Sequence, residues 1–155
     1  MDVYQKLREM DLALPTLPVS GGNYALVTKT GNLLFTSGQT PKENGVLIKK
    51  GKVGREVSEE EGYQLAKRCT HNALAAIENA AGSLDNVVRI VKATVFVSSD
   101  PAFTAQAKVA NGATDLLVEL FGAENGRPAR SAVGMAVLPG DAPCEVELIA
   151  EVKAQ

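Results

Sequence analysis

The sequence predicts an α+β fold in which two helices cover one face of a mixed β-sheet. Three observations predict it: a hairpin pattern near the N-terminus, two long segments with helical periodicity, and apolar alternating segments after each helix. The chain has 155 residues, of which 45% are hydrophobic and 22% charged, and these values are ordinary for one globular domain. We therefore expect a single domain across residues 1–155.

The first part of the chain predicts a short helix, a connector and a hairpin. Apolar residues recur on one face of residues 2–11, which is typical of a helix. Pro15 and Pro18 then favour an extended connector, because proline fixes the backbone and restricts the residue before it. Residues 24–28 and 33–37 are expected to form the two strands of a hairpin around a Gly-Asn turn.

The strongest helix signal lies in the middle of the chain. Ser58 and Glu61 have the spacing of a capping box, and Gly82 is placed to end the helix that follows. The apolar stripe between them has helical spacing. Its members are Tyr63, Ala66, Thr70, Ala73, Leu74, Ile77 and Ala81.

The second half predicts a strand, a helix and two further strands. Residues 88–98 alternate as a strand, with Val91 expected on the same face as Ala93, Val95 and Val97. Asp100-Pro101 is expected to begin a second helix that ends near residue 122. The expected elements, in order, are helix 2–11, strands 24–28, 33–37 and 46–48, helix 58–81, strand 88–98, helix 100–122, and strands 131–137 and 144–152.

Neither face of the last two strands has the pattern of a plain solvated surface. On the last strand, Val146, Leu148, Ala150 and Val152 point one way, whereas three glutamates and Ile149 point the other. On the strand before it, the small residues Ala132, Gly134 and Ala136 share one face. We therefore expect the sheet to pack against helices on one side and against another subunit on the other.

Composition excludes several function classes. The net charge of −2 and the 5% of aromatic residues argue against a nucleic-acid partner. No apolar stretch has the length of a membrane span, and the first residues lack the apolar core of a signal peptide. One histidine and two cysteines argue against a structural zinc site and indicate a reducing compartment, so we expect a cytoplasmic protein.

The histidine and the cysteines have structural interpretations. His71 falls beside Gln64 and Arg68 on the polar side of its helix, which predicts a solvated side chain. Cys69 lies beside the apolar stripe and is interpreted as a core thiol. Cys144 precedes Glu145 and is a candidate for exposure, with no sign of activation.

Three features point to chemistry, and each has a structural alternative that stays open. Arg130 at the start of a strand offers a guanidinium that matches a carboxylate, but it is also an ordinary surface arginine. Glu145 and Glu147 share a strand face, as a pair of functional carboxylates or as solvated acids. The Ser37-Gly38 strand end permits close approach of a ligand, or is simply the end of a hairpin.

Five motifs then follow one another between about Gly22 and Val152. They are Gly22-Asn23-Tyr24, Phe35-Thr36-Ser37-Gly38-Gln39, Val91-Lys92-Ala93-Thr94-Val95-Phe96-Val97, Pro128-Ala129-Arg130-Ser131, and Leu138-Pro139-Gly140 followed by Glu145-Val146-Glu147-Leu148-Ile149-Ala150. In this order they resemble the YjgF/RidA family, the reactive intermediate (enamine/imine) deaminases, also called endoribonuclease L-PSP. The resemblance implies a chorismate-mutase-like fold and a homotrimer of inward-packed sheets, with three pockets between subunits.

The resemblance also implies which residues form the site. Arg130 matches the arginine that holds the substrate carboxylate, and Glu145 matches the glutamate that activates water. Tyr24, Ser37 and Asn111 match substrate-binding positions. No cofactor or metal is implied.

Two departures concern the subgroup of this family. Ala132 stands where archetypal members often carry a cysteine, and residues 1–20 are an N-terminal extension. Both features resemble the longer, chorismate-mutase-like subgroup. The resemblance therefore implies the fold and the arginine site more strongly than it implies the particular activity.

Three functions follow, from different classes. The first is a cofactor-free deaminase that hydrolyses 2-imino acids to 2-oxo acids and ammonia. The alternative, favoured by Ala132, is a non-catalytic trimeric protein that binds small carboxylates. Endoribonuclease activity follows from the family description, but the acidic net charge and the single histidine give it little physical support.

Overall fold

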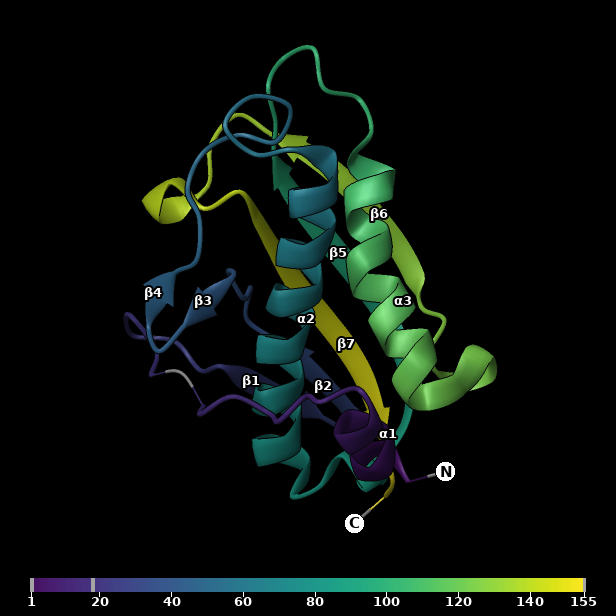
Figure 1. Cartoon of the computed structure of the whole chain (residues 1–155). Helices are drawn as coiled ribbons and strands as arrows, with labels where there is room; N and C mark the ends of the chain where they lie inside the picture. Colours follow the sequence, from purple (N-terminus) through teal and green to yellow (C-terminus); the bar gives the residue numbers. More distant parts are fainter. Residues whose placement is uncertain (1, 18, 155) are drawn as a thin grey trace.

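The chain folds as an α+β structure with helices on one face of a five-stranded sheet, which confirms the predicted class (Figure 1). The computed structural model describes residues 2–17 and 19–154. Within the sheet, β5 and β6 are parallel and the other neighbours are antiparallel, so the sheet is mixed. The strand order is β1 (Val27–Thr30), β2 (Leu33–Thr36), β7 (Cys144–Val152), β5 (Val87–Ser98), β6 (Ala129–Met135).

The N-terminal segment forms the predicted short helix. Helix α1 (Val3–Glu9) begins at Asp2, whose carboxylate accepts hydrogen bonds from the backbone amides of Tyr4 and Gln5. Its hydrophobic face packs on the core through Val3 and Leu7. Of the two connector prolines, Pro18 lies outside the described residues.

Helix α2 (Glu59–Ala81) confirms the capping signals. The Ser58 hydroxyl accepts a hydrogen bond from the Glu61 amide, and the Glu61 carboxylate accepts one from the Ser58 amide. Gly82 ends the helix in the left-handed region, with φ of 77°. Leu74 and Ile77 are fully buried between this helix and the sheet.

Strand β5 contains a bulge that the alternation pattern did not predict. Ile90 pairs with Ala150 and Lys92 with Ile149, so Val91 is an extra residue on β5. The bulge turns the strand by one residue: Ile90 is buried, whereas Val91 is 36% exposed. The expectation that Val91 shares the core face of Ala93 is therefore wrong.

Helix α3 (Gln106–Asn125) starts later than predicted. The Asp100 carboxylate accepts a hydrogen bond from the Ala102 amide, and the Asp100 carbonyl accepts one from the Phe103 amide. These bonds close a turn around Pro101 instead of a helical turn, so the expectation of a helix start at Asp100-Pro101 is wrong. Near the other end Gly122 leaves helical geometry, with φ of 80°, where the end was predicted.

A second, two-stranded sheet lies beside the middle of α2, where Arg68 and Asn72 donate to the Lys42 carbonyl. Strands β3 (Lys42–Glu43) and β4 (Val46–Leu47) pair around Asn44 and Gly45, which both have positive φ. The 3-10 turns η1 (Leu84–Asn86) and η2 (Pro139–Asp141) complete the elements of the described residues. None of the helices in the described ranges is long and apolar enough to cross a membrane.

The small residues of β6 lie on the side of the sheet that carries the helices, where Ala132 is half-buried and Gly134 is exposed. Ala132 packs against the core, and a Cβ added to Gly134 would lie 2.9 Å from the Gln106 amide nitrogen on α3. Ala136 follows the end of β6 and is exposed. The expectation that this set lies on the side of the sheet opposite the helices is wrong, because Ala132 and Gly134 pair with Val95 and Val97, which are buried under the helices.

The opposite face of the sheet carries no helix. Apolar side chains on it include Phe35 of β2 and Val133 of β6, each 36% exposed. The register places Phe96 next to Val133, and Ile149 next to Phe35. This helix-free face is the apolar surface that the sequence predicted, but other residues form it.

Candidate functional site

A cavity of about 330 Å³ lies at the end of the sheet where β2 and β7 meet the small hairpin. Its wall includes the predicted Tyr24 and Glu145. Gly38, Asn72 and Gly140 also contribute to it. The structure therefore brings two of the five predicted site residues to one cavity.

Glu145 lies on the helix-free face of β7, with its carboxylate directly over Gly38. A Cβ built on Gly38 would lie 2.0 Å from Oε1 of Glu145, so only glycine leaves room for this carboxylate. Burial raises the pKa of Glu145 above its ordinary value, and the negative charge of Glu147 raises it further. A half-buried carboxylate with a raised pKa is suited to accept a proton near neutral pH.

Tyr24 lies in the wall of this cavity, whereas Ser37 does not. Tyr24 is 55% exposed, and its hydroxyl accepts a hydrogen bond from the Gly21 amide at 3.2 Å. Ser37 is not part of the cavity wall; its hydroxyl donates to the Ala25 carbonyl at 2.6 Å. Its observed contact therefore ties the end of β2 to the segment that carries Tyr24.

Arg130 and Asn111 form a second cluster, on the helix-covered side. Nη1 of Arg130 donates to Oδ1 of Asn111 at 2.7 Å and to Oγ1 of Thr114 at 3.2 Å. Both partners lie on α3, which fixes the guanidinium at the edge of the sheet. A guanidinium has five N–H donors, and among the described residues the contacts of Arg130 come from Nη1 alone, so the fork retains donors for a carboxylate.

Arg130 and Glu145 therefore lie on opposite faces of one sheet. The register pairs Arg130 with Ala93, whose side chain is buried under the helices. It pairs Glu145 with Phe96, on the helix-free face. Within one chain the structure does not bring the two predicted catalytic residues together, which the sequence did not foresee.

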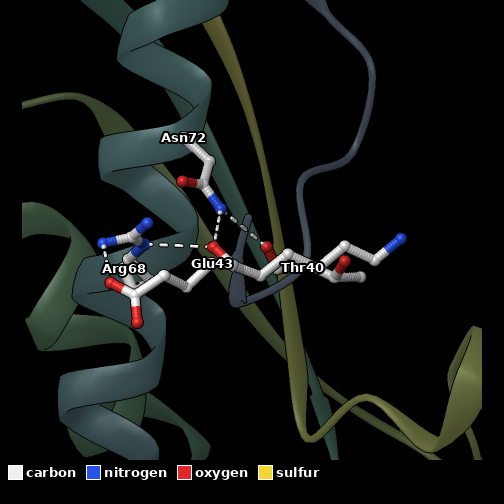
Figure 2. A network of polar contacts seen from close by, with 5 residues as sticks. Thr40, Glu43, Arg68 and Asn72 are labelled. Carbon is white, nitrogen blue, oxygen red and sulfur yellow. Dashed lines mark hydrogen bonds and ion pairs between the residues drawn. The ribbon is translucent and has the colours of Figure 1, made fainter. Parts of the chain in front are cut away.

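The cavity floor is held by a network that sequence reasoning missed (Figure 2). Asn72 on α2 donates from Nδ2 to the carbonyls of Thr40 and Lys42, at 3.0 and 3.1 Å. Arg68, one turn away, donates to the same Lys42 carbonyl at 3.1 Å and pairs with Glu43 at 3.5 Å. A polar pair at helical spacing was the available signal, but its partners are backbone atoms that sequence patterns do not reveal.

The structure corrects the interpretation of His71. Its side chain is buried, at 4% exposure, although it was expected to be solvated. It lies on the side of α2 that faces Leu116 of α3 and Leu12 of the connector. Burial, and next the charges of Arg68 and Lys67, lower the pKa of His71 to about 4.

The two cysteines lie together in the core. Cys69 is buried as predicted, and Cys144 is buried as well, so its expected exposure is wrong. Their sulfur atoms are 3.7 Å apart, at hydrogen-bond distance and without a disulfide, and Cys144 faces α2 because it lies on the inner side of β7. Burial raises the pKa of the Cys69 thiol well above its ordinary value, which makes it a poor nucleophile at neutral pH.

In the described part of the chain, no group of three His, Cys, Asp or Glu side chains is placed to hold a metal ion. The fold and the two clusters define a small α+β protein with a carboxylate and a guanidinium on opposite faces of one sheet. Residues 5–152 match the family described as "YjgF/chorismate mutase-like, putative endoribonuclease", and the chain belongs to this family.

Relatives with full-length similarity carry different descriptions. The chain is 39% identical to protein TCP17 of Trypanosoma cruzi, over 97% of this chain and 94% of that protein. It is 34% identical to 2-iminobutanoate/2-iminopropanoate deaminase of Escherichia coli K12, over 90% and 94% of the two chains. The crystal structure of a protein from Shewanella oneidensis, titled a "putative endoribonuclease", superposes with a TM-score of 0.94 at 32% identity, covering 98% of this chain and all of that one.

Proposed function

We propose that the protein is a cofactor-free hydrolase of 2-imino acids, which converts them to 2-oxo acids and ammonia. The observation that carries the proposal is the carboxylate of Glu145, half-buried over Gly38 in a cavity and with a raised pKa. The similarity to 2-iminobutanoate/2-iminopropanoate deaminase supports the same reaction class.

The proposed site is shared between two subunits of a homotrimer. Arg130 and Glu145 lie on opposite faces in one chain, so a pocket that contains both needs the Glu145 face of one chain beside the Arg130 edge of the next. The exposed apolar residues of the helix-free face, such as Phe35 and Val133, supply the surface that such packing buries.

In the proposed reaction Arg130 binds the substrate carboxylate through its two-pronged fork. Glu145 accepts a proton from water as the water oxygen attacks the imine carbon and the C=N electrons move to nitrogen. Glu145 returns this proton to nitrogen, which gives a neutral carbinolamine. Glu145 then takes the hydroxyl proton as C=O forms, and it passes that proton to nitrogen as the C–N bond breaks, so that ammonia leaves and the carboxylate is restored. Because an imine carbon is already electrophilic, positioning and one base supply the catalysis.

Tyr24 and Asn111 have supporting roles in this proposal. Tyr24 presents its ring at the cavity wall, where it contacts the substrate side chain. Asn111 holds the guanidinium from the side of α3. Ser37 acts through the strand end that carries Gly38, since its hydroxyl is bonded to the Ala25 carbonyl.

A non-catalytic carboxylate-binding trimer is the second candidate. Ala132, on the same face as Arg130 and two residues beyond it, supports this candidate, because it offers the pocket no reactive group. Arg130 remains the binding residue in both candidates.

The deciding experiment measures ammonia release from freshly generated 2-iminopropanoate, with and without protein. Ammonia release above the spontaneous rate is expected. If release does not exceed that rate while 2-oxobutanoate still binds in calorimetry, the protein has the binding function instead. Specific cleavage of RNA by nuclease-free protein would contradict both. Light scattering is expected to return three times the chain mass, and a stable monomer at micromolar concentration would remove the shared site.

A further inference from the structure

A second cavity, of about 230 Å³, lies on the other side of α2 from the candidate site. Its walls are Leu12 of the connector after α1, four residues of α2, and Leu116 of α3. The α2 residues are Gln64, Lys67, Arg68 and His71. It lies on the helix-covered side of the molecule, away from the face that the proposed trimer buries.

The charges around this cavity are of one sign. Lys67 and Arg68 are its charged wall residues, and no carboxylate contributes to the wall. Arg68 is partly committed to Glu43 and the Lys42 carbonyl, whereas Lys67 has no ion pair among the described residues. An anion in this position would balance two cations that the fold holds beside each other.

His71 adds a buried ring nitrogen that has no partner among the described residues. Its Nε2 atom is buried and makes no hydrogen bond in the described part of the chain. Buried polar side-chain atoms nearly always have a partner, so an unpartnered one beside a cavity indicates a missing water or ligand. Leu12 and Leu116, from the two other elements packed here, are apolar and favour a ligand with a hydrocarbon part.

We propose that this cavity binds a small aliphatic carboxylate, whose charge pairs with Lys67 and faces His71 while its alkyl group contacts Leu12 and Leu116. A bare inorganic anion would match the cations but leave the two leucines without an apolar partner. A neutral ligand would fill the space but leave the cations unpaired. The site is separate from Arg130 and stands whether or not the proposed hydrolase activity does.

The chain contains one histidine, which makes the test direct. The imidazole resonances of 15N-histidine-labelled protein are recorded at constant pH during titration with 2-methylpropanoate. The neutral isostere 2-methylpropanamide and inorganic phosphate are titrated in parallel. A saturable shift with 2-methylpropanoate, much weaker with the other two, is expected. A separate pH titration with and without 2-methylpropanoate is expected to show a higher His71 pKa in its presence, because the added negative charge favours the imidazolium.

Three variants locate the binding. Lys67→Met keeps the length of the side chain without its charge and is expected to weaken the carboxylate affinity by about tenfold or more. Lys108→Met is the matched control, because it removes an exposed lysine elsewhere, paired with Glu59 at 3.6 Å, and it is expected to bind like the parent. Arg130→Ala is also expected to retain the His71 shift, which separates this cavity from the proposed active site.

Five outcomes would overturn the proposal. No saturable shift means that the cavity holds only water. Equal shifts with the amide mean an apolar pocket, and a shift with phosphate alone means an inorganic anion site. Unchanged affinity in Lys67→Met, or equal loss in Lys108→Met, means that the charge of Lys67 does not bind the ligand.

Discussion

The carboxylate of Glu145 occupies the space that a side chain at position 38 would fill, since a Cβ on Gly38 would lie 2.0 Å from Oε1 and 2.7 Å from the carboxyl carbon. Gly38 does not have a positive φ, so its backbone conformation is open to any residue. The requirement for glycine here is therefore steric, and it concerns the position of a single carboxylate.

Gly38→Ala is expected to move Glu145 without unfolding the protein. The clashing atoms belong to the end of a flexible side chain, which can rotate away at small cost in stability. We expect the melting temperature to stay within a few degrees of the parent, while the imine hydrolysis rate falls by roughly tenfold or more. Thermal unfolding and the ammonia-release assay check this, and a large loss of stability with unchanged rate would contradict it.

Arg130→Ala is expected to weaken the binding of 2-oxobutanoate by on the order of 30- to 1000-fold, because a charge-assisted bidentate pair is lost. Arg130→Lys is expected to recover only part of this affinity, since an ammonium lacks the planar fork. Calorimetric titration measures both variants. Parental affinity in Arg130→Ala would show that the carboxylate binds elsewhere.

Glu145 sets the expected pH dependence of the reaction. As a base it must be ionised, so kcat/KM is expected to fall on the acid side around a pKa above the ordinary 4.5, because burial and Glu147 raise it. Glu145→Gln is expected to slow turnover by about 100-fold while 2-oxobutanoate still binds. A rate profile without this acid limb, or an unimpaired glutamine variant, would exclude Glu145 as the base.

The same substitution is expected to stabilise the fold at neutral pH. When the pKa of a carboxyl is raised in the folded state, the free energy of unfolding falls as the pH rises through that pKa, because the folded state then holds an unfavourable charge. Urea unfolding of parent and Glu145→Gln at pH 7 and pH 4 checks this. The glutamine variant is expected to gain at pH 7 relative to the parent, with a smaller difference at pH 4.

Mixing two inactive chains tests whether the site is shared. In a cyclic trimer of Arg130→Ala and Glu145→Gln chains, every mixed trimer contains one pocket with both native residues. Co-refolding at equal amounts is expected to restore about a quarter of the parental activity. Gly38→Ala mixed with Glu145→Gln is the control, because both changes affect the same half of the pocket and should restore nothing beyond their own residual rates.

His71 is expected to make the fold sensitive to mild acid. Its pKa is about 4 in the folded chain against an ordinary 6.5, so the unfolded chain gains a proton first as the pH falls. Stability is therefore fully present above pH 6.5 and is lost as the pH falls towards 4. Unfolding free energies of the parent and His71→Gln across this range are expected to converge at low pH, and parallel curves would contradict the prediction.

The sequence predicted correctly those parts of the fold that depend on residues close together in the chain. The Ser58 and Glu61 cap, the stop at Gly82 and the alternation of β7 each reside in a few consecutive side chains. The start of α3 was missed because Asp100 satisfies the nearby amide in a turn, which serves that residue as well as a helix cap would.

Features that depend on two distant segments were not predicted. Alternation shows that Ala132 and Gly134 share a face, but not that this face is the one that carries α3. The bulge at Val91 needs the register of β7, and the burial of His71 needs both α3 and the connector. For the site, family resemblance identified candidate residues, while their division between two sheet faces follows only from the strand register.

Helices α2 and α3 approach closely next to Asn111, at Gly112. A Cβ on Gly112 would lie 2.0 Å from the carbonyl oxygen of Tyr63, so the two helices touch there through their backbones. Asn111, which holds Arg130, directly precedes this main-chain contact. We therefore expect substitutions of one aliphatic residue for another elsewhere between these helices to leave the position of the Arg130 guanidinium unchanged.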